Sequence, residues 1–245
     1  MKRLPALAFA MSLALVACGQ REPTHDMSPS APANAAREDA DFAMRLILIE
    51  GHLQVGRDLM EAGQTQNALP HFGHPVRELY SDMIPVIVHR NGQQFDRDLI
   101  ALEGLAAQQQ NSETFRSAFD AALAKVHAAH DLIPAEKWAS DEFVLGIVAD
   151  TASVAAQEYR NALVAGRIDS LIEYHDARGF VLRLSDLLAA HHGSDPRLAQ
   201  AAAIVAELRG YVGSLTPPDP PSATDAQFEQ KAAELRALVG AAPAP

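Results

Sequence analysis

The sequence predicts an all-α protein, a duplicated antiparallel four-helix bundle with about eight helices in two pseudo-repeats. From residue 38 onwards, apolar residues recur at helical spacing, and the alternating β-branched runs typical of strands are absent. Two Ala-Gly turns, at Gly63 and Gly166, each follow the first helix of a four-helix unit. Short connections between successive helices favour antiparallel neighbours, and therefore bundles.

The N-terminus predicts an export signal that ends at a lipidation site. Residues 1–3 carry positive charge, and residues 4–16 form an apolar run too short to span a hydrocarbon core of ~30 Å. The sequence Leu15-Val16-Ala17-Cys18 resembles the bacterial lipobox, which implies a signal peptide over residues 1–17 and lipidation of Cys18. An ordinary secretory signal with a chance cysteine is the alternative.

The residues after Cys18 bear on where the protein is anchored. Gly19-Gln20 follows with no Asp, which by resemblance to sorted lipoproteins favours the outer membrane over the inner one. We therefore expect a lipid-anchored protein of the bacterial cell envelope, at the outer membrane and facing the periplasm. Residues 18–37 are rich in Pro, Ser, Ala and Asn and are expected to form a flexible tether.

Composition excludes several classes of site and partner. Cys18 is the single cysteine, so a lipidated chain has no thiol left for disulfides, thiolate metal sites or nucleophilic catalysis. The chain has 20 basic and 31 acidic residues, a net charge of -11, which becomes -13 once Lys2 and Arg3 are removed. Such a surface repels phosphate backbones, so no nucleic-acid partner is expected. The negative net charge is compatible with binding of a metal cation, although most acidic surfaces only keep a protein soluble.

The first repeat, residues 38–131, is predicted to contain four helices. Pro75 and Pro85 fall inside the second of them, and each removes a backbone donor, so we expect a kink or a restart there, with His74 as a cap. The predicted helices cover residues 38–62, 65–89, 94–109 and 112–130.

The second repeat, residues 132–240, matches the first in the order of its elements. Its first helix begins near Trp138 or Ser140, and Thr224 with Gln227 predicts a capping box for its last. Residues 241–245 are expected to be a disordered tail. The predicted helices end near residues 164, 191, 213 and 239.

The candidate metal ligands lie beside the first turn. On a regular helix His71, His74 and Glu78 share one face, and His52 on the preceding helix could lie at a similar height. Imidazole and carboxylate groups of this kind can bind Zn, Cu or Fe. The alternative is that these histidines are hydrogen-bonded residues of the core. Glu50 lies on another side of its helix from His52, so both are not expected to point inward.

The other histidines are less promising candidates. The pairs His127 with His130 and His191 with His192 lie at helix C-termini, where the helix dipole favours a cation. His175-Asp176 is expected on the surface. The Gly-x-Ser-x-Gly and His-Glu-x-x-His motifs are absent, so the sequence predicts no enzyme.

The first helix, the Ala-Gly turn and a second helix with Ala68, Phe72 and a His/Glu-rich stretch resemble the imelysin and EfeO-like proteins. The resemblance implies an envelope protein of two pseudo-repeated four-helix bundles, linked to the uptake of iron or other metals. The Gly-x-His-x-x-Glu or His-x-x-Glu signature of that family is not matched, since His71 is followed by His74 and the step from His74 to Glu78 is one residue too long.

These observations predict an envelope-anchored, non-enzymatic lipoprotein that binds a metal ion or small ligand through His52, His71, His74 and Glu78, with a role in metal uptake or homeostasis. The divalent transition metals Fe, Zn and Cu are the expected ligands. The alternative is a structural or adaptor lipoprotein that binds another envelope protein.

Overall fold

The computed structural model describes residues 31–108 and 112–240, and almost all of this part is helical. The predicted all-α bundle is confirmed. Cys18, the signal peptide at residues 1–17 and the tail at residues 241–245 lie outside the described residues. In chain order the elements are α1 (Ala31–Glu61), α2 (Thr65–His74), the π-helix η1 (Pro75–Tyr80), α3 (Ser81–His89), α4 (Asp96–Ala107), α5 (Glu113–His130), α6 (Ala135–Trp138), α7 (Asp141–Ala162), β1 (Leu163–Val164), β2 (Arg167–Ile168), α8 (Leu171–Ala190), α9 (Pro196–Tyr211) and α10 (Asp225–Leu238).

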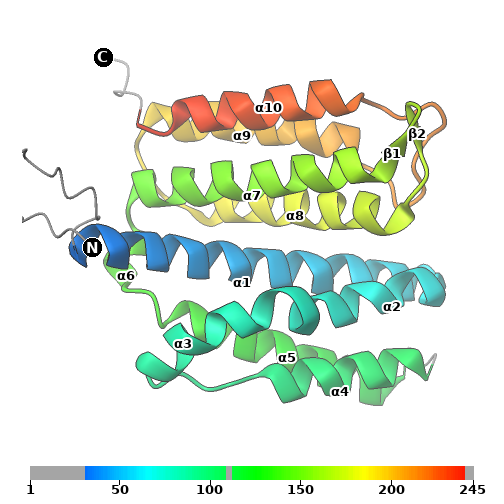
Figure 1. The fold of residues 1–245 in the computed structure, drawn as a ribbon, viewed down its shortest axis with the longest axis horizontal. Coiled ribbons are helices and arrows are strands. Elements are labelled where there is room, and N and C mark those ends of the chain that lie inside the picture. The colour runs from blue at the N-terminus through cyan, green and yellow to red at the C-terminus, as the bar shows by residue number, and fades with distance from the viewer. Residues whose placement is uncertain (1–30, 109–111, 241–245) are drawn as a thin grey trace, which may run out of the picture.

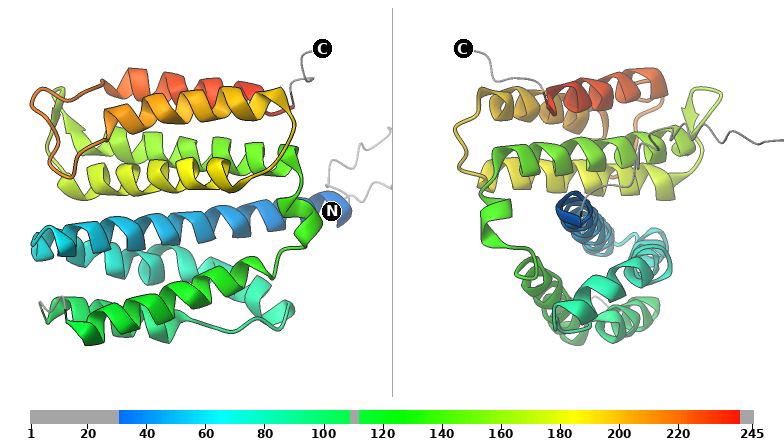
Figure 2. Two further views of the ribbon diagram at one scale, coloured as in Figure 1. Left: turned by 180° about the vertical axis from the view of Figure 1, so that it is seen from behind. Right: turned by 60° about the vertical axis from the view of Figure 1, so that its left-hand side comes forward.

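Helix α1 lies in the middle of the molecule, with α2 to α5 on one side and α7 to α10 on the other (Figures 1 and 2). It packs against α2 and α5 on the first side and against α7 and α8 on the second. The buried apolar residues form two clusters, one built mainly from α1 to α5 and one from α7 to α10. Leu48 of α1 belongs to the second cluster, so α1 contributes to both cores.

Helix α1 is longer than predicted. It begins at Ala31, so the last part of the expected tether is helical rather than flexible. The stretch from Ala31 to Ala36 is rich in alanine, the residue with the highest helix propensity, and Pro32 is tolerated because it lies in the first turn.

At Pro75, where the sequence predicts a kink or a restart, the helix changes type, while the helical path continues from Thr65 to His89. The missing amide of Pro75 is accommodated by a π-helix, η1, between α2 and α3. His74 keeps helical dihedral angles and makes no side-chain capping bond, so its expected capping role is wrong. Its side chain is free to turn towards α8.

The two Ala-Gly turns differ in structure. After α1, Gly63 has a φ of +73° and the Gln64 amide donates to the Leu59 carbonyl, which is a Schellman helix end. After α7, Ala165 and Gly166 have φ of +50° and +77° and form the tip of the short β1–β2 hairpin. The second turn therefore reverses the chain as a hairpin instead of as a helix cap.

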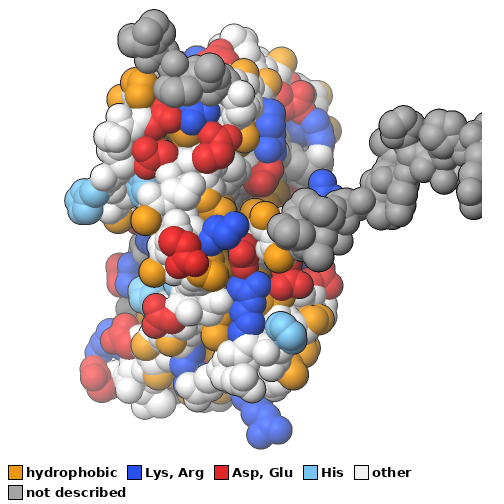
Figure 3. All heavy atoms as spheres, turned by 90° about the vertical axis from the view of Figure 1, so that its left-hand side faces the viewer, with side chains coloured by type: hydrophobic (Ala, Val, Ile, Leu, Met, Phe, Trp, Pro, Cys, Tyr) orange, Lys and Arg blue, Asp and Glu red, His pale blue; other side chains and the backbone are white. Residues whose placement is uncertain are grey.

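At the end of the bundle seen in Figure 3, acidic and basic side chains are interspersed, without a continuous patch of one sign. Within residues 31–108 and 112–240, no helix combines the length and the apolar character that crossing a membrane requires.

Candidate metal centre

Four polar side chains from three helices meet between the two cores. We call His52 of α1, His71 and His74 of α2 and Asp176 of α8 the His–Asp cluster. The Nδ1 atoms of His52 and His71 each lie 2.7 Å from Asp176 Oδ1, and His74 Nδ1 lies 3.3 Å from Asp176 Oδ2. One possible ligand atom from each of the four residues lies within 4.8 Å of all the others. The cluster therefore joins the first half of the molecule to the second.

Close helix packing makes this convergence possible. A methyl group at Gly179 of α8 would overlap the carbonyl of Gly51, and one at Gly51 would lie 2.7 Å from Phe180 Cδ1. On α1, a methyl group at Gly56 would lie 2.8 Å from the ring of Phe72 on α2. Glycine thus lets α8 and α2 both approach α1 near His52, so that an aspartate on α8 can reach histidines of both other helices.

The cluster is buried, with side-chain exposure of 0% at His71, 4% at His52 and 6% at Asp176. His74 is the most accessible member at 17%, so an ion would enter from its side. The contact between His71 Nδ1 and Asp176 is a hydrogen bond. The contacts of His52 and His74 with Asp176 lack hydrogen-bond alignment, so their Nδ1 atoms have no hydrogen-bond partner, and neither does His71 Nε2.

The electrostatics of the cluster favour an ionised aspartate. Burial alone would raise the pKa of Asp176, but its interactions with His52, His71 and His74 hold that pKa well below the ordinary range. Burial lowers the pKa of His71, whereas the Asp176 carboxylate raises the pKa of His74. At neutral pH the cluster therefore presents one carboxylate and imidazole nitrogens, which are ligand groups for a divalent cation.

These side chains offer the ligand groups of a transition-metal ion. The Nδ1 atoms of His52 and His74 face the Asp176 carboxylate without an aligned hydrogen bond, and a buried polar atom without a partner costs about 1–3 kcal/mol. Ligand atoms around a tetrahedral ion stand about 3.3 Å apart when the bonds are 2.0–2.1 Å long. His74 Nδ1 lies 3.3 Å from Asp176 Oδ2, whereas the 2.7 Å contacts of His52 and His71 are to the other oxygen, Oδ1. The four ligand atoms lie within 4.8 Å of one another, so small side-chain shifts would be needed to bring them to tetrahedral spacing.

The structure brings His52, His71 and His74 together but leaves Glu78 outside. The Glu78 side chain is 57% exposed, and its carboxylate lies 3.9 Å from His74 Nε2, on the ring edge away from the Nδ1 that faces Asp176. The expectation that His175-Asp176 lies on the surface is wrong, since both residues are buried. Asp176 is four residues before Phe180, which is buried in the second core, and this helical spacing was the sequence signal that could have found it.

A second buried polar group lies on the other side of α1. We call Glu50, His127 and His130 of α5 and Arg183 of α8 the Glu50 cluster. Glu50 Oε1 lies 2.8 Å from His130 Nε2 and 3.5 Å from His127 Nε2, and Arg183 donates to Oε2 from Nε at 3.0 Å. Glu50 and His52 are both 3% exposed, contrary to expectation, because helices surround α1 on both sides.

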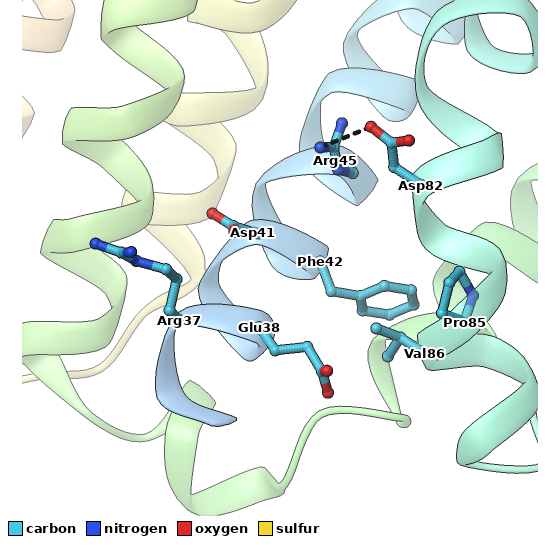
Figure 4. Close-up of a pocket in the computed structure, with 8 residues that line it drawn as sticks. All are labelled: Arg37, Glu38, Asp41, Phe42, Arg45, Asp82, Pro85 and Val86. Atoms are coloured by element: carbon cyan, nitrogen blue, oxygen red, sulfur yellow. Dashed lines mark ion pairs between the residues drawn. The ribbon is translucent and has the colours of Figure 1, made fainter. Parts of the chain in front are cut away.

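A surface cavity of about 290 Å³ lies between the start of α1 and α3 (Figure 4). Among its charged side chains, Arg45 pairs with Asp82 at 3.0 Å, and Glu38 pairs with Arg90 at 3.0 Å. Because acidic and basic side chains are mixed in its lining, the cavity offers no distinctive ligand chemistry. It is lined by Arg37, Glu38, Asp41, Phe42, Arg45, Asp82, Pro85 and Val86.

Comparison with known proteins bears on the second half of the chain. Residues 134–243 match the family model described as an iron permease-associated 4-helix bundle domain. No curated protein and no solved structure matches the chain. The matched segment covers α7 to α10 and contains Asp176, while the three histidines of the His–Asp cluster lie before it. The match does not point to imelysin or EfeO-like proteins specifically. The second half of the chain is similar to a helical bundle tied to iron uptake.

Proposed function

We propose that this protein binds a divalent transition-metal ion at the His–Asp cluster and serves metal uptake or homeostasis at the cell envelope, without catalysing a reaction. The observation that supports it most is the convergence of three imidazoles and one carboxylate, with the Nδ1 atoms of all three histidines facing the buried Asp176 carboxylate. The lipid anchor at Cys18 and the outer-membrane location are part of this proposal. The role in metal uptake is common to the matched family and to the imelysin and EfeO-like resemblance.

The ligand set selects a class of ion. Imidazole nitrogens suit Zn, Cu, Fe and Ni, while Mg and Ca prefer oxygen ligands. With neutral imidazoles, the one carboxylate of the cluster gives it a single negative charge, which balances a divalent ion better than a trivalent one. The similarity of residues 134–243 to an iron permease-associated domain favours Fe(II) as the physiological ion.

Metal titration of the purified protein tests the proposal. Calorimetry with Zn(II), and with Fe(II) under anaerobic conditions, should show one site per chain. The double variant His71→Ala, His74→Ala should lose this binding, because it removes two of four ligands. The matched control is His192→Ala, which removes an exposed histidine outside the cluster and should leave the affinity unchanged.

Two outcomes would overturn the proposal: no binding of Zn(II), Cu(II) or Fe(II) to the wild-type protein, or binding that survives loss of both His71 and His74. The first outcome would favour the adaptor role, in which the bundle surface binds another envelope protein. Circular dichroism of each variant should show an unchanged helical spectrum, so that loss of binding is not loss of fold.

A further inference from the structure

A buried histidine next to the cluster has no role in the proposed function so far. The His175 ring on α8 lies against the His71 ring, with centroids 5.6 Å apart and planes inclined by 72°. Both residues have 0% exposure. Each has one ring nitrogen without a hydrogen-bond partner: Nε2 of His71 and Nδ1 of His175.

The partners of the remaining nitrogens fix where the protons are. His175 Nε2 lies 2.8 Å from the Leu215 carbonyl oxygen, which can only accept, so Nε2 carries the proton and Nδ1 is a lone pair. His71 Nδ1 lies 2.7 Å from the ionised Asp176, so Nδ1 carries its proton and Nε2 is a lone pair. Two neighbouring buried imidazoles therefore each hold an unpaired acceptor, and neither can donate to the other.

Metal binding would resolve this mismatch. If His71 binds the ion through Nδ1, the proton leaves Nδ1, and one proton is taken up on Nε2, so the neutral ring keeps a single proton. The Nε2–H group then needs an acceptor, and the adjacent lone pair of His175 Nδ1 supplies it. The centroids are 5.6 Å apart. If the two nitrogens turned to point at each other along the line between the centroids, they would be about 3.3 Å apart, close to hydrogen-bond range.

We propose that His175 is the outer-shell partner of the metal site, accepting a hydrogen bond from Nε2–H of His71 and so holding the His71 ring with Nδ1 towards the ion. This inference rests on the proposed function. Metal-bound histidines usually donate their other N–H to such a partner, and loss of the partner typically weakens metal binding 10–100-fold. The Leu215 carbonyl accepts a hydrogen bond from Nε2–H of His175 and so keeps Nδ1 of His175 available as an acceptor.

Two variants and one spectroscopic measurement test the role of His175. His175→Leu removes the acceptor and should lower the Zn(II) affinity roughly 10–100-fold. His175→Asn keeps an oxygen acceptor near the place of Nδ1 and should restore the affinity to within about threefold of wild type. Calorimetry measures both, and urea denaturation without metal shows how far each change affects stability alone.

Nitrogen-15 NMR of the histidine rings of the wild-type protein reports the proton positions directly and needs no variant that could misfold. On addition of Zn(II), His71 should change from the Nδ1–H form to a form with Nδ1 bound and Nε2 protonated, while His175 stays Nε2–H. His71 bound through Nε2 would overturn the inference, as would equal affinities for wild type and His175→Leu. Failure of the wild-type protein to bind Zn(II) at all would instead overturn the proposed function.

Discussion

The His–Asp cluster and the Glu50 cluster follow one plan on opposite sides of α1. Each combines one side chain of α1, a pair of histidines three residues apart on another helix of the first half, and one side chain of α8. They differ in what α8 contributes. Arg183 brings a permanent positive charge to Glu50, with Nη2 at 2.8 Å, whereas Asp176 brings a negative charge to three histidines.

The difference shows how a buried carboxylate can be balanced in two ways. In the Glu50 cluster the cation is part of the chain, so the group is complete and serves the packing of α1 against α5 and α8. In the His–Asp cluster no guanidinium lies against the carboxylate among the described contacts, and imidazole nitrogens remain without partners. In our proposal an external cation completes the second arrangement, so we expect ion binding there and structural stabilisation at Glu50.

The largest expected effect separates the two clusters by metal affinity. Asp176→Asn removes the one anionic ligand of the His–Asp cluster and should weaken Zn(II) binding roughly 1,000-fold, or ~4 kcal/mol. Glu50→Gln, the same chemical change in the other cluster, should leave the affinity within about threefold. Calorimetry on both variants checks the contrast, and equal losses would mean that the clusters do not have separate roles.

The second prediction concerns the stability of the metal-free protein, for which the Glu50 cluster should matter. Glu50→Gln removes a buried partner of Arg183 and should lower the free energy of unfolding by about 3 kcal/mol. Asp186→Asn removes the exposed partner of the same arginine and should cost less than about 1 kcal/mol. Urea denaturation measures both changes. A small effect of Glu50→Gln would show that the Glu50 cluster does not stabilise the packing of α1.

A third variant tests the helix crossing that both clusters need. Gly179→Ala should push α8 away from α1 and cost about 2 kcal/mol of stability, because the added methyl meets the Gly51 carbonyl. It should also weaken Zn(II) binding, since Asp176 is carried on α8. The matched control is Gly104→Ala on α4, which meets no atom within 4 Å and should be slightly stabilising. Equal behaviour of the two variants would contradict the close crossing.

The clusters should also respond differently to acid. Burial raises the pKa of Glu50, but His130, Arg183 and His127 hold it below the ordinary value of 4.5. Its stabilising effect is therefore complete above pH 4.5 and is lost as the pH falls through the lower folded-state pKa. The stability difference between wild type and Glu50→Gln should therefore narrow between pH 5 and pH 3, which urea denaturation at the two pH values measures.

The stabilising effect of ionised Asp176 should be lost only at a lower pH, because its interactions hold its pKa well below 3.8. Urea denaturation of the metal-free protein over this pH range compares Glu50→Gln with Asp176→Asn. As the pH falls, the stability loss caused by Glu50→Gln should disappear before the loss caused by Asp176→Asn. The opposite order would show that Asp176 is not the more strongly stabilised anion.

The smallest effect concerns the ligand that the sequence suggested and the structure leaves out. Glu78→Gln should change Zn(II) affinity by less than about twofold, since the Glu78 carboxylate is more than half exposed and lies outside the cluster. Calorimetry against wild type decides this. A loss comparable to that of Asp176→Asn would place Glu78 among the ligands and would require α2 and η1 to rearrange.

Local sequence patterns predicted much of the fold and three of the four cluster residues. The spacing of His71 and His74, and the turn at Gly63 that sets His52 at their height, are local features that survive in the structure. Local spacing to Phe180 could have marked Asp176 as buried, but it could not have identified the partners of Asp176, because His71 is 105 residues away in sequence. The position of α1 between the two cores explains a second failure, since Glu50 and His52 could not both be inward on a helix buried on one side only.

The sharing of α1 by both cores has a consequence for where the chain can be divided. The segment similar to the iron permease-associated domain contains the four long helices α7 to α10 and the short α6. Cut out or fused to another protein, it would carry one of the four proposed ligands and would expose the faces of α7 and α8 that α1 covers. By itself, that segment would therefore lack the proposed metal site. The site needs α1 and α2 as well, so a protein that lost these N-terminal helices would also lose the ion.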